Sequence, residues 1–167
     1  MQARMTQGHK DKKLAVAFVC LGNICRSPMA EAVFAHTVKT QDLESRFSRI
    51  ESFGTARYHI GESPDERSAS TCRDNGVPVD HKAQQIKDHH FKEFDYVICM
   101  DESNLNNLRR ICKDKSLLNK IYLFGHWNTD GKYNKIVDDP YYGGIDGFQY
   151  NFNQVKYFSE EFLKTEL

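Results

Sequence analysis

Residues 14–28 read LAVAFVCLGNICRSP, and they predict the fold more strongly than any other stretch of the 167-residue chain. The run Leu14–Val19 is apolar throughout, which is typical of a strand buried on both faces of a sheet. Ser27 and Pro28 form a usual helix start, with Ser27 at the N-cap and Pro28 at the first helical position. We therefore expect a strand, a tight loop and a helix in direct succession.

The loop between this strand and this helix is expected to bind an anion. In an open α/β sheet, ligands bind beyond the carboxyl ends of the strands. A helix N-terminus there offers free N–H groups and a positive dipole. Successive N–H groups around a glycine can also form a nest of phosphate size. The predicted phosphate-binding loop consists of Leu21, Gly22, Asn23, Ile24 and Cys25.

Cys20 opens the loop and Arg26 closes it. A free cysteine is only a few per cent thiolate at neutral pH, and amides, a helix dipole and a guanidinium would all favour the thiolate. The guanidinium is a planar fork that matches two phosphoryl oxygens, which lysine cannot do. A cysteine and an arginine at this spacing also arise by chance, as a buried thiol and a surface charge. The strand, the glycine and the Ser-Pro pair favour a nucleophile and a phosphate clamp.

The rest of the chain alternates apolar strand patterns with helical ones. Further strands are expected at residues 50–53, 96–100 and 120–124, and helices at about 28–39, 65–75, 88–94, 102–113 and 148–163. Residues 81–86 are expected to be irregular or a short edge segment, and 131–147 a loop. This alternation predicts an α/β protein, a single-domain flavodoxin-like four-stranded parallel sheet with helices on both faces. Residues 1–13 are polar without periodicity and are expected to form a disordered N-terminal tail before one domain, residues 14–167.

Composition limits the possible functions and compartments. The formal net charge is zero, so no overall field attracts nucleic acid or a membrane surface, and neither is an expected partner. Five cysteines without a C-x2-C pair favour a reduced, cytoplasmic setting. Three lysines before the first strand imitate a signal peptide, but the apolar run is only about eight residues and no A-x-A-like site follows. His89 and His90 lack partners at metal spacing, so no metal or other cofactor is expected.

The loop CLGNICRSP at Cys20–Pro28 resembles the active-site loop of the low-molecular-weight protein tyrosine phosphatases. The resemblance continues through GESPD at 61–65, MDESN at 100–104 and DDPYYG at 138–143, covers about residues 14–167, and is greatest to the fungal members. It implies hydrolysis of phosphotyrosine and small aryl phosphates through a cysteinyl-phosphate at Cys20, with Arg26 holding the phosphoryl group. The partners would be phosphotyrosine-containing proteins.

A thiolate that displaces a tyrosine phenolate needs a proton donor, because that leaving group has a pKa near 10. Asp139 is the candidate general acid and base. It precedes Pro140, which biases its backbone to an extended conformation, and Asp138 adds a like charge beside it. Two solvated acids in a turn would be the simpler interpretation without the Cys20 loop. The family resemblance points to the same aspartate.

The remaining candidate residues surround these three. Tyr58, Tyr141 and Tyr142 are expected to wall a slot that only an aryl phosphate can traverse, although one or two of them could instead pack on the core. Asp101, at the end of a predicted strand, is expected to orient Arg26. Asn23 can adopt the left-handed backbone that a tight loop requires. The resemblance implies a supporting hydrogen-bond network around the loop from Asn23, Ser27, Ser52 and His81.

The role of Cys25 is open. In the family, a second cysteine in the loop can form a reversible disulfide with the nucleophile under peroxide, so Cys25 is either a redox protector or a passive small residue.

Two alternative functions are also open. Some enzymes with this fold reduce arsenate, but they relay a disulfide through further cysteines. Cys72, Cys99 and Cys112 lie on separate predicted elements. The other alternative is a catalytically dead phosphotyrosine-binding module, but the presence of Cys20, Arg26 and Asp139 favours an active enzyme.

Overall fold

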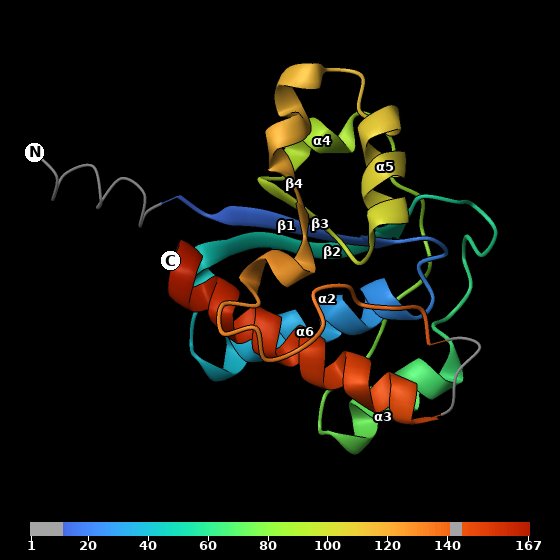
Figure 1. Ribbon diagram of the computed structural model, residues 1–167, viewed down its shortest axis with the longest axis vertical. Coiled ribbons are helices and arrows are strands. Elements are labelled where there is room, and N and C mark those ends of the chain that lie inside the picture. The colour runs from blue at the N-terminus through green and yellow to red at the C-terminus, as the bar shows by residue number, and fades with distance from the viewer. Residues whose placement is uncertain (1–11, 141–144) are drawn as a thin grey trace, which may run out of the picture.

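The computed structural model describes residues 12–140 and 145–167, and it confirms the predicted α/β fold. Four parallel strands form one sheet in the order β2-β1-β3-β4, as the alternating pattern predicts (Figure 1). The first eleven residues of the predicted tail lie outside the described residues. The strands are β1 (Leu14–Cys20), β2 (Phe47–Gly54), β3 (Tyr96–Cys99) and β4 (Ile121–Leu123).

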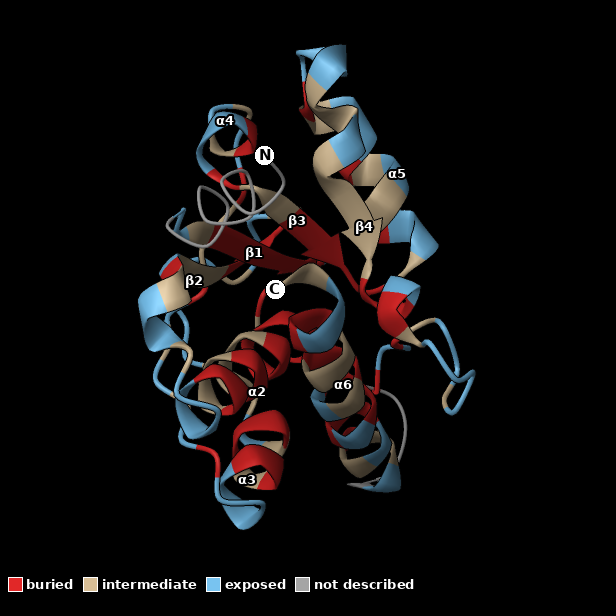
Figure 2. Cartoon of the chain, turned by 90° about the vertical axis from the view of Figure 1, so that its left-hand side faces the viewer, coloured by how far each residue is buried: buried red, intermediate tan, exposed pale blue. Residues whose placement is uncertain are grey.

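Helices cover both faces of the sheet. α2 (Arg26–Thr40), α3 (Glu66–Asp74) and α6 (Ile145–Glu166) lie on one face, and α4 (His90–Glu93) and α5 (Glu102–Ile111) lie on the other (Figures 1 and 2). None of the helices in the described part of the chain is long and apolar enough to cross a membrane. Three short 3₁₀ helices complete the fold, at Glu44–Arg46, Lys115–Lys120 and Phe124–Trp127.

Strand β1 is buried on both faces because its successive side chains enter two different cores. Val16 and Phe18 pack with α2 and α6, whereas Ala17 and Val19 pack with α4 and α5. The aromatic stripe of α6, which the sequence predicts as core, lies in the first cluster with Phe148, Phe158 and Phe162 fully buried. Burying one such side chain stabilises the fold by about 1.5–3 kcal/mol. The sheet is therefore a rigid platform for the loop at the end of β1.

The predicted N-cap at Ser27 is wrong. α2 begins at Arg26, Cys25 occupies the N-cap position without a side-chain cap, and Ser27 is buried inside the first turn. The Ser27 hydroxyl has other partners, Cys20 Sγ and Asn23 Nδ2, so it does not cap the helix amides. The boundaries of several elements also differ from the prediction by up to three residues: β2 begins at Phe47, β4 ends at Leu123, and α6 begins at Ile145, inside the segment expected to be a loop.

Candidate active site

The loop between β1 and α2 is held in place through its carbonyl groups. The segment after β2 and the start of α3 supply the donors, so the loop is fixed by parts of the chain distant in sequence. Four bonds do this: Thr55 N–H to Cys20 O (2.9 Å), Ala56 N–H to Leu21 O (2.9 Å), Asp65 N–H to Ile24 O (2.8 Å), and the Ser68 hydroxyl to Cys25 O (2.8 Å).

These bonds orient the amide groups of the loop. In a trans peptide, the N–H of one residue points opposite to the C=O of the residue before it. Carbonyls bound to the outer scaffold therefore turn the amides of Leu21, Gly22, Cys25 and Arg26 toward the inner side of the loop. Asn23, with φ of 59°, makes the left-handed turn that the sequence predicts at this position. Several amides that point to one side in this way are the arrangement that an anion nest requires.

Gly54, at the end of β2, lets that strand approach the loop closely. A Cβ atom on Gly54 would lie 2.7 Å from the Leu21 carbonyl oxygen, a distance that requires the backbone to shift. The same end of β2 provides the Phe53 carbonyl that accepts from the Ser27 hydroxyl at 3.3 Å. Close packing of the two backbones therefore positions both the loop and the first turn of α2.

Cys20 lies at the carboxyl end of β1, 3% exposed, with its Sγ 3.0 Å from the Ser27 hydroxyl. Ser27 Oγ also accepts from Asn23 Nδ2 at 2.8 Å. Because the Ser27 hydroxyl has one hydrogen, it donates either to the Phe53 carbonyl at 3.3 Å or to Cys20 Sγ at 3.0 Å, and a thiolate at Cys20 favours the second partner. The predicted contact between Ser27 and the Cys20 sulfur is thus present, although Ser27 is not the N-cap.

Asn23 connects the loop to the structure beneath it. Its Oδ1 accepts from the Gln84 backbone N–H at 2.9 Å, which fixes the orientation of the amide, and its Nδ2 donates to the Ser52 hydroxyl at 3.0 Å. The same Oδ1 lies 2.7 Å from His81 Nε2, so this nitrogen carries a hydrogen. The predicted grouping of Asn23, Ser27, Ser52 and His81 is therefore present.

A partly buried carboxyl group, Glu31 on α2, extends this network. The Ser52 hydroxyl donates to Glu31 Oε1 at 2.7 Å, and His81 Nδ1 lies 3.3 Å from the same oxygen. Burial raises the pKa of Glu31 to about 7 and lowers the pKa of His81. Both directions favour neutral side chains over an ion pair between Glu31 and His81.

Arg26 is 4% exposed and is held from one side. Its Nη1 donates to Asp101 Oδ2 at 2.6 Å and to the Val137 carbonyl at 3.1 Å. Burial alone would lower the pKa of Arg26, but the charges of Cys20 and Asp101 raise it overall. The expectation that Asp101 orients Arg26 agrees with this geometry. Asp139 lies on the other side, with its Oδ2 3.9 Å from Arg26 Nη2.

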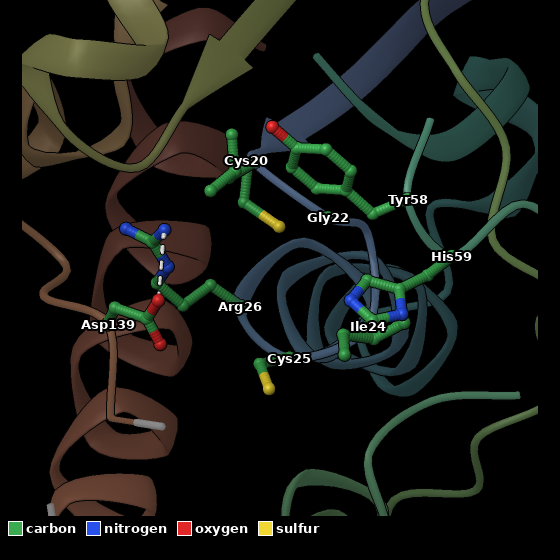
Figure 3. A pocket seen from close by; sticks show the side chains of 9 residues that line it. Cys20, Gly22, Ile24, Cys25, Arg26, Tyr58, His59 and Asp139 are labelled. Atoms are coloured by element: carbon green, nitrogen blue, oxygen red, sulfur yellow. Dashed lines mark ion pairs between the residues drawn. The ribbon is translucent and has the colours of Figure 1, made fainter. Parts of the chain in front are cut away.

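Cys20, Arg26 and Asp139 line one cavity of about 240 Å³ (Figure 3). Tyr58 stands at its rim, 74% exposed, and Ile24 and His59 form the side away from Asp139. Leu21, Gly22 and Cys25 complete the lining. A small anion with an apolar substituent fits such a site: guanidinium and amides at the base, apolar side chains at the mouth and one carboxylate beside the entrance.

Comparison with known proteins decides the family. The family model of low molecular weight phosphotyrosine protein phosphatase matches residues 15–167. The chain belongs to this family. A Saccharomyces cerevisiae protein of that name is 57% identical over 93% of this chain and 96% of its own, which agrees with the predicted likeness to fungal members. Membership places the protein among the protein-tyrosine phosphatases, as the loop sequence predicts.

Two solved structures carry the same fold. A protein tyrosine phosphatase from Entamoeba histolytica, with Hepes in its active site, has a TM-score of 0.87 and 32% identity, covering 92% of this chain and 97% of its own. A Drosophila structure titled an arginine phosphatase has a TM-score of 0.84 and 32% identity, covering 92% and 98%. The fold thus occurs in proteins named for different phosphorylated residues.

The other cysteines of this low molecular weight phosphatase are buried. Burial raises the pKa of the Cys25, Cys72 and Cys99 thiols to about 12, and it raises the pKa of Cys112 as well. For Cys25, the carboxylate of Asp65 adds to this effect. These four side chains are therefore protonated near neutral pH.

Sequence reasoning missed three residues that shape this candidate site. Glu31 lies four residues after Ser27, a spacing that places both on one face of α2 and that could have drawn attention to it. Gln84 acts through its backbone N–H, which no side-chain pattern reveals. His59 packs against Gly22, where a Cβ would lie 2.9 Å from its ring. Tyr141 and Tyr142, predicted to wall the pocket, lie outside the described residues.

Proposed function

We propose that this protein hydrolyses phosphotyrosine in proteins, and small aryl phosphates, through a phosphoryl group carried on Cys20. One observation carries the proposal: Cys20 Sγ, the Arg26 guanidinium and the Asp139 carboxylate converge on a single small cavity. This arrangement supplies an attacking atom, a clamp for the phosphoryl oxygens and a proton donor for the leaving group. We place the protein in the cytoplasm, where cysteine thiols stay reduced.

In the first step, the Cys20 thiolate attacks phosphorus and an S–P bond forms. The bond from phosphorus to the phenolic oxygen breaks, and its electron pair stays on that oxygen. Asp139, protonated at this stage, donates its proton there, so the product leaves as a neutral phenol. The loop amides and Arg26 bind the three equatorial oxygens of the transition state, where the charge is spread.

In the second step, water attacks the phosphoryl group. Asp139, now a carboxylate, accepts the proton of that water, and the S–P bond breaks with its electron pair returning to sulfur. Inorganic phosphate is released, and both residues regain their starting forms. The Ser27 hydroxyl, 3.0 Å from Cys20 Sγ, stabilises the thiolate as it departs.

The walls of the cavity support an aromatic leaving group. Leu21, Ile24 and Tyr58 give the mouth an apolar character that suits a phenyl ring. A guanidino leaving group would carry several N–H donors into the same space, where Asp139 is the one carboxylate among the described residues that line the cavity. The Entamoeba structure is described as having Hepes in its active site, and Hepes is a small molecule with a sulfonate group, which supports an oxyanion site at this loop.

The buried cysteines weigh against arsenate reduction. A reductase needs thiols that relay a disulfide from the nucleophile to the surface. Cys72, Cys99 and Cys112 are fully buried on α3, on β3 and after α5, and all five cysteines are free. A binding module without chemistry would not need a carboxylate beside the clamp, so Asp139 favours an enzyme.

The test is phosphate release from a phosphotyrosine peptide and a phosphoarginine peptide of the same sequence, with EDTA present. We expect the tyrosine peptide to be hydrolysed at least tenfold faster. Cys20→Ser should bind inorganic phosphate but release none from either peptide. Faster release from the arginine peptide would overturn the proposed substrate class, and turnover by Cys20→Ser would overturn the covalent mechanism.

A further inference from the structure

A second hollow adjoins the cavity that contains Cys20. It has a volume of about 370 Å³ and lies between the segment after β2 and the last turn of α5. Leu21 and Tyr58 line both hollows, so these two side chains form a shared wall. We call this second hollow the side groove. The rest of its lining consists of Thr55, Ala56, Asn107, Arg110 and Ile111.

The shared wall is unusually exposed for apolar side chains. Leu21 is 42% exposed and Tyr58 is 74% exposed. Ile60, two residues after Tyr58, is 56% exposed. Large apolar side chains that gather in the open around a pocket commonly mark a surface that binds another molecule. The ring of a substrate tyrosine inside the Cys20 cavity would reach only the inner side of this wall.

The outer side of the groove carries positive charge. Arg110 donates to the Asn107 side chain, and both residues line the groove. Among the residues that the structure describes, no carboxylate lies within 4.0 Å of the Arg110 guanidinium, in contrast to Arg49 and Arg73, which are both ion-paired. Its neighbour Arg109 is also exposed but does not line the groove. The groove therefore presents an available guanidinium next to an apolar wall.

We propose that the side groove receives the polypeptide segment next to the phosphotyrosine and that it favours an acidic side chain there. The inference rests on the proposed function, because it takes the phosphoryl group to be at Cys20. A phosphotyrosine in the cavity leaves its own backbone at the rim, beside Tyr58. Each further residue extends the chain by about 3.3 Å. The neighbours of the tyrosine thus pass over the wall into the groove, where Arg110 pairs with Glu or Asp and Leu21 and Ile111 contact an apolar side chain.

The expected effect is moderate because Arg110 is exposed to solvent. Exposed ion pairs contribute little, and the resulting preference should be about two- to fivefold in kcat/KM. It should decrease as salt is added, since screening weakens exposed pairs. Because the paired carboxylate belongs to the substrate, the effect should be absent for a substrate without flanking residues.

The experiment compares phosphotyrosine peptides with Glu, Gln or Lys at the positions on either side of the phosphotyrosine, and p-nitrophenyl phosphate, which has no flanking residues. The proteins are the wild type, Arg110→Glu, and Arg109→Glu, which makes the same charge change on the same helix outside the groove. The wild type should favour Glu peptides, Arg110→Glu should favour Lys peptides, and Arg109→Glu should resemble the wild type. All three should hydrolyse p-nitrophenyl phosphate equally.

If Arg110→Glu and Arg109→Glu change the peptide preference equally, the preference comes from the overall charge of the surface. That result would overturn the proposed role of the side groove. Indifference of the wild type to peptide charge would overturn it as well. If the wild type fails on p-nitrophenyl phosphate and on every peptide, the proposed function fails instead. If the melting temperatures of the two variants differ, Arg110→Gln is compared with the wild type instead. This variant should lose the preference for Glu peptides without gaining a preference for Lys peptides.

Discussion

Arg26 Nη1 lies 2.6 Å from Asp101 Oδ2, while Oδ1 of the same carboxylate accepts the Asn104 N–H at 2.8 Å and caps α5. The carboxylate therefore joins the first turn of α2 to the first turn of α5. The bond to the Asn104 N–H fixes the position of the Asp101 carboxylate, and the carboxylate in turn fixes the position of the Arg26 guanidinium. These contacts hold the Arg26 guanidinium in one orientation, so we expect little reorganisation of it during the reaction.

Asp101→Asn should separate these two roles. Asparagine is as good an N-cap as aspartate, so α5 and the melting temperature should change little. Loss of the charge-assisted bond to Arg26 should lower kcat/KM for p-nitrophenyl phosphate by about tenfold or more. Asp114→Asn, at the cap of the 3₁₀ helix Lys115–Lys120, is the matched control and should keep full activity. Full activity of Asp101→Asn would mean that Arg26 needs no carboxylate to hold it.

Glu31 should make stability depend on pH. Its pKa is raised from 4.5 to about 7 by burial, so the folded state binds a proton that the unfolded state releases between these values. The stabilisation is therefore present at about pH 4 and is lost as pH rises through about 7. At 1.36 kcal/mol for each pKa unit, the loss is about 3 kcal/mol at most.

The measurement for Glu31 is urea unfolding at about pH 5 and about pH 8, for the wild type and Glu31→Gln. Glutamine keeps the shape and removes the titration. The wild type should lose stability relative to Glu31→Gln as pH rises. The opposite trend would show that Glu31 and His81 form a charged pair inside the protein.

Cys25 should act as a resolving thiol only slowly at neutral pH. Peroxide converts the Cys20 thiolate to a sulfenic acid, and condensation with the Cys25 thiol gives a disulfide and water. The attacking form is the Cys25 thiolate, and burial raises the pKa of that thiol to about 12. Disulfide formation after a peroxide pulse should therefore accelerate about tenfold for each rise of about one pH unit.

Mass spectrometry after alkylation measures this rate, and Cys25→Ser is the control. The variant should form no such disulfide and should recover less activity with dithiothreitol. A rate independent of pH would indicate that the loop opens and exposes Cys25 during oxidation.

Asp139 should matter most for basic leaving groups. Asp139→Asn cannot donate a proton, so phosphoenzyme formation from a phenyl phosphate with a leaving-group pKa near 10 should slow by about a hundredfold. A nitrophenyl phosphate should slow much less in that step. Single-turnover rates across substituted phenyl phosphates measure this, and Asp138→Asn is the neighbouring control. Equal slopes for the wild type and Asp139→Asn would transfer the acid role to another group.

The local features of the site were predictable from sequence, and the long-range ones were only partly so. The apolar run before Cys20 and the turn at Asn23 are properties of adjacent residues, so pattern reasoning located the loop. The Ser-Pro pair predicts Ser27 at the helix cap because serine before proline usually caps a helix. In the folded protein its hydroxyl is nearer to Cys20 Sγ and Asn23, and those contacts exist only because the loop turns back on itself.

Residues that act across the fold were harder to find. Glu31 looks like an ordinary helix-surface acid until β2 brings Ser52 against it. Asp139 lies beside Arg26 because the chain returns past the end of β3, where Val137 N–H bonds to the Met100 carbonyl. No periodicity in the sequence encodes that return. The family resemblance supplied the assignment, and the 3.9 Å contact with Arg26 is consistent with it.

The most direct test of the account is to detect the phosphorylated residue during turnover. The wild type is mixed with excess p-nitrophenyl phosphate, quenched in acid within the first turnovers and digested, and the fragments are sequenced by mass spectrometry. We expect one phosphoryl group on Cys20, none on Cys25, and none on the Cys20→Ser protein. A phosphoryl group on any other residue, or active enzyme that never carries one, would contradict it.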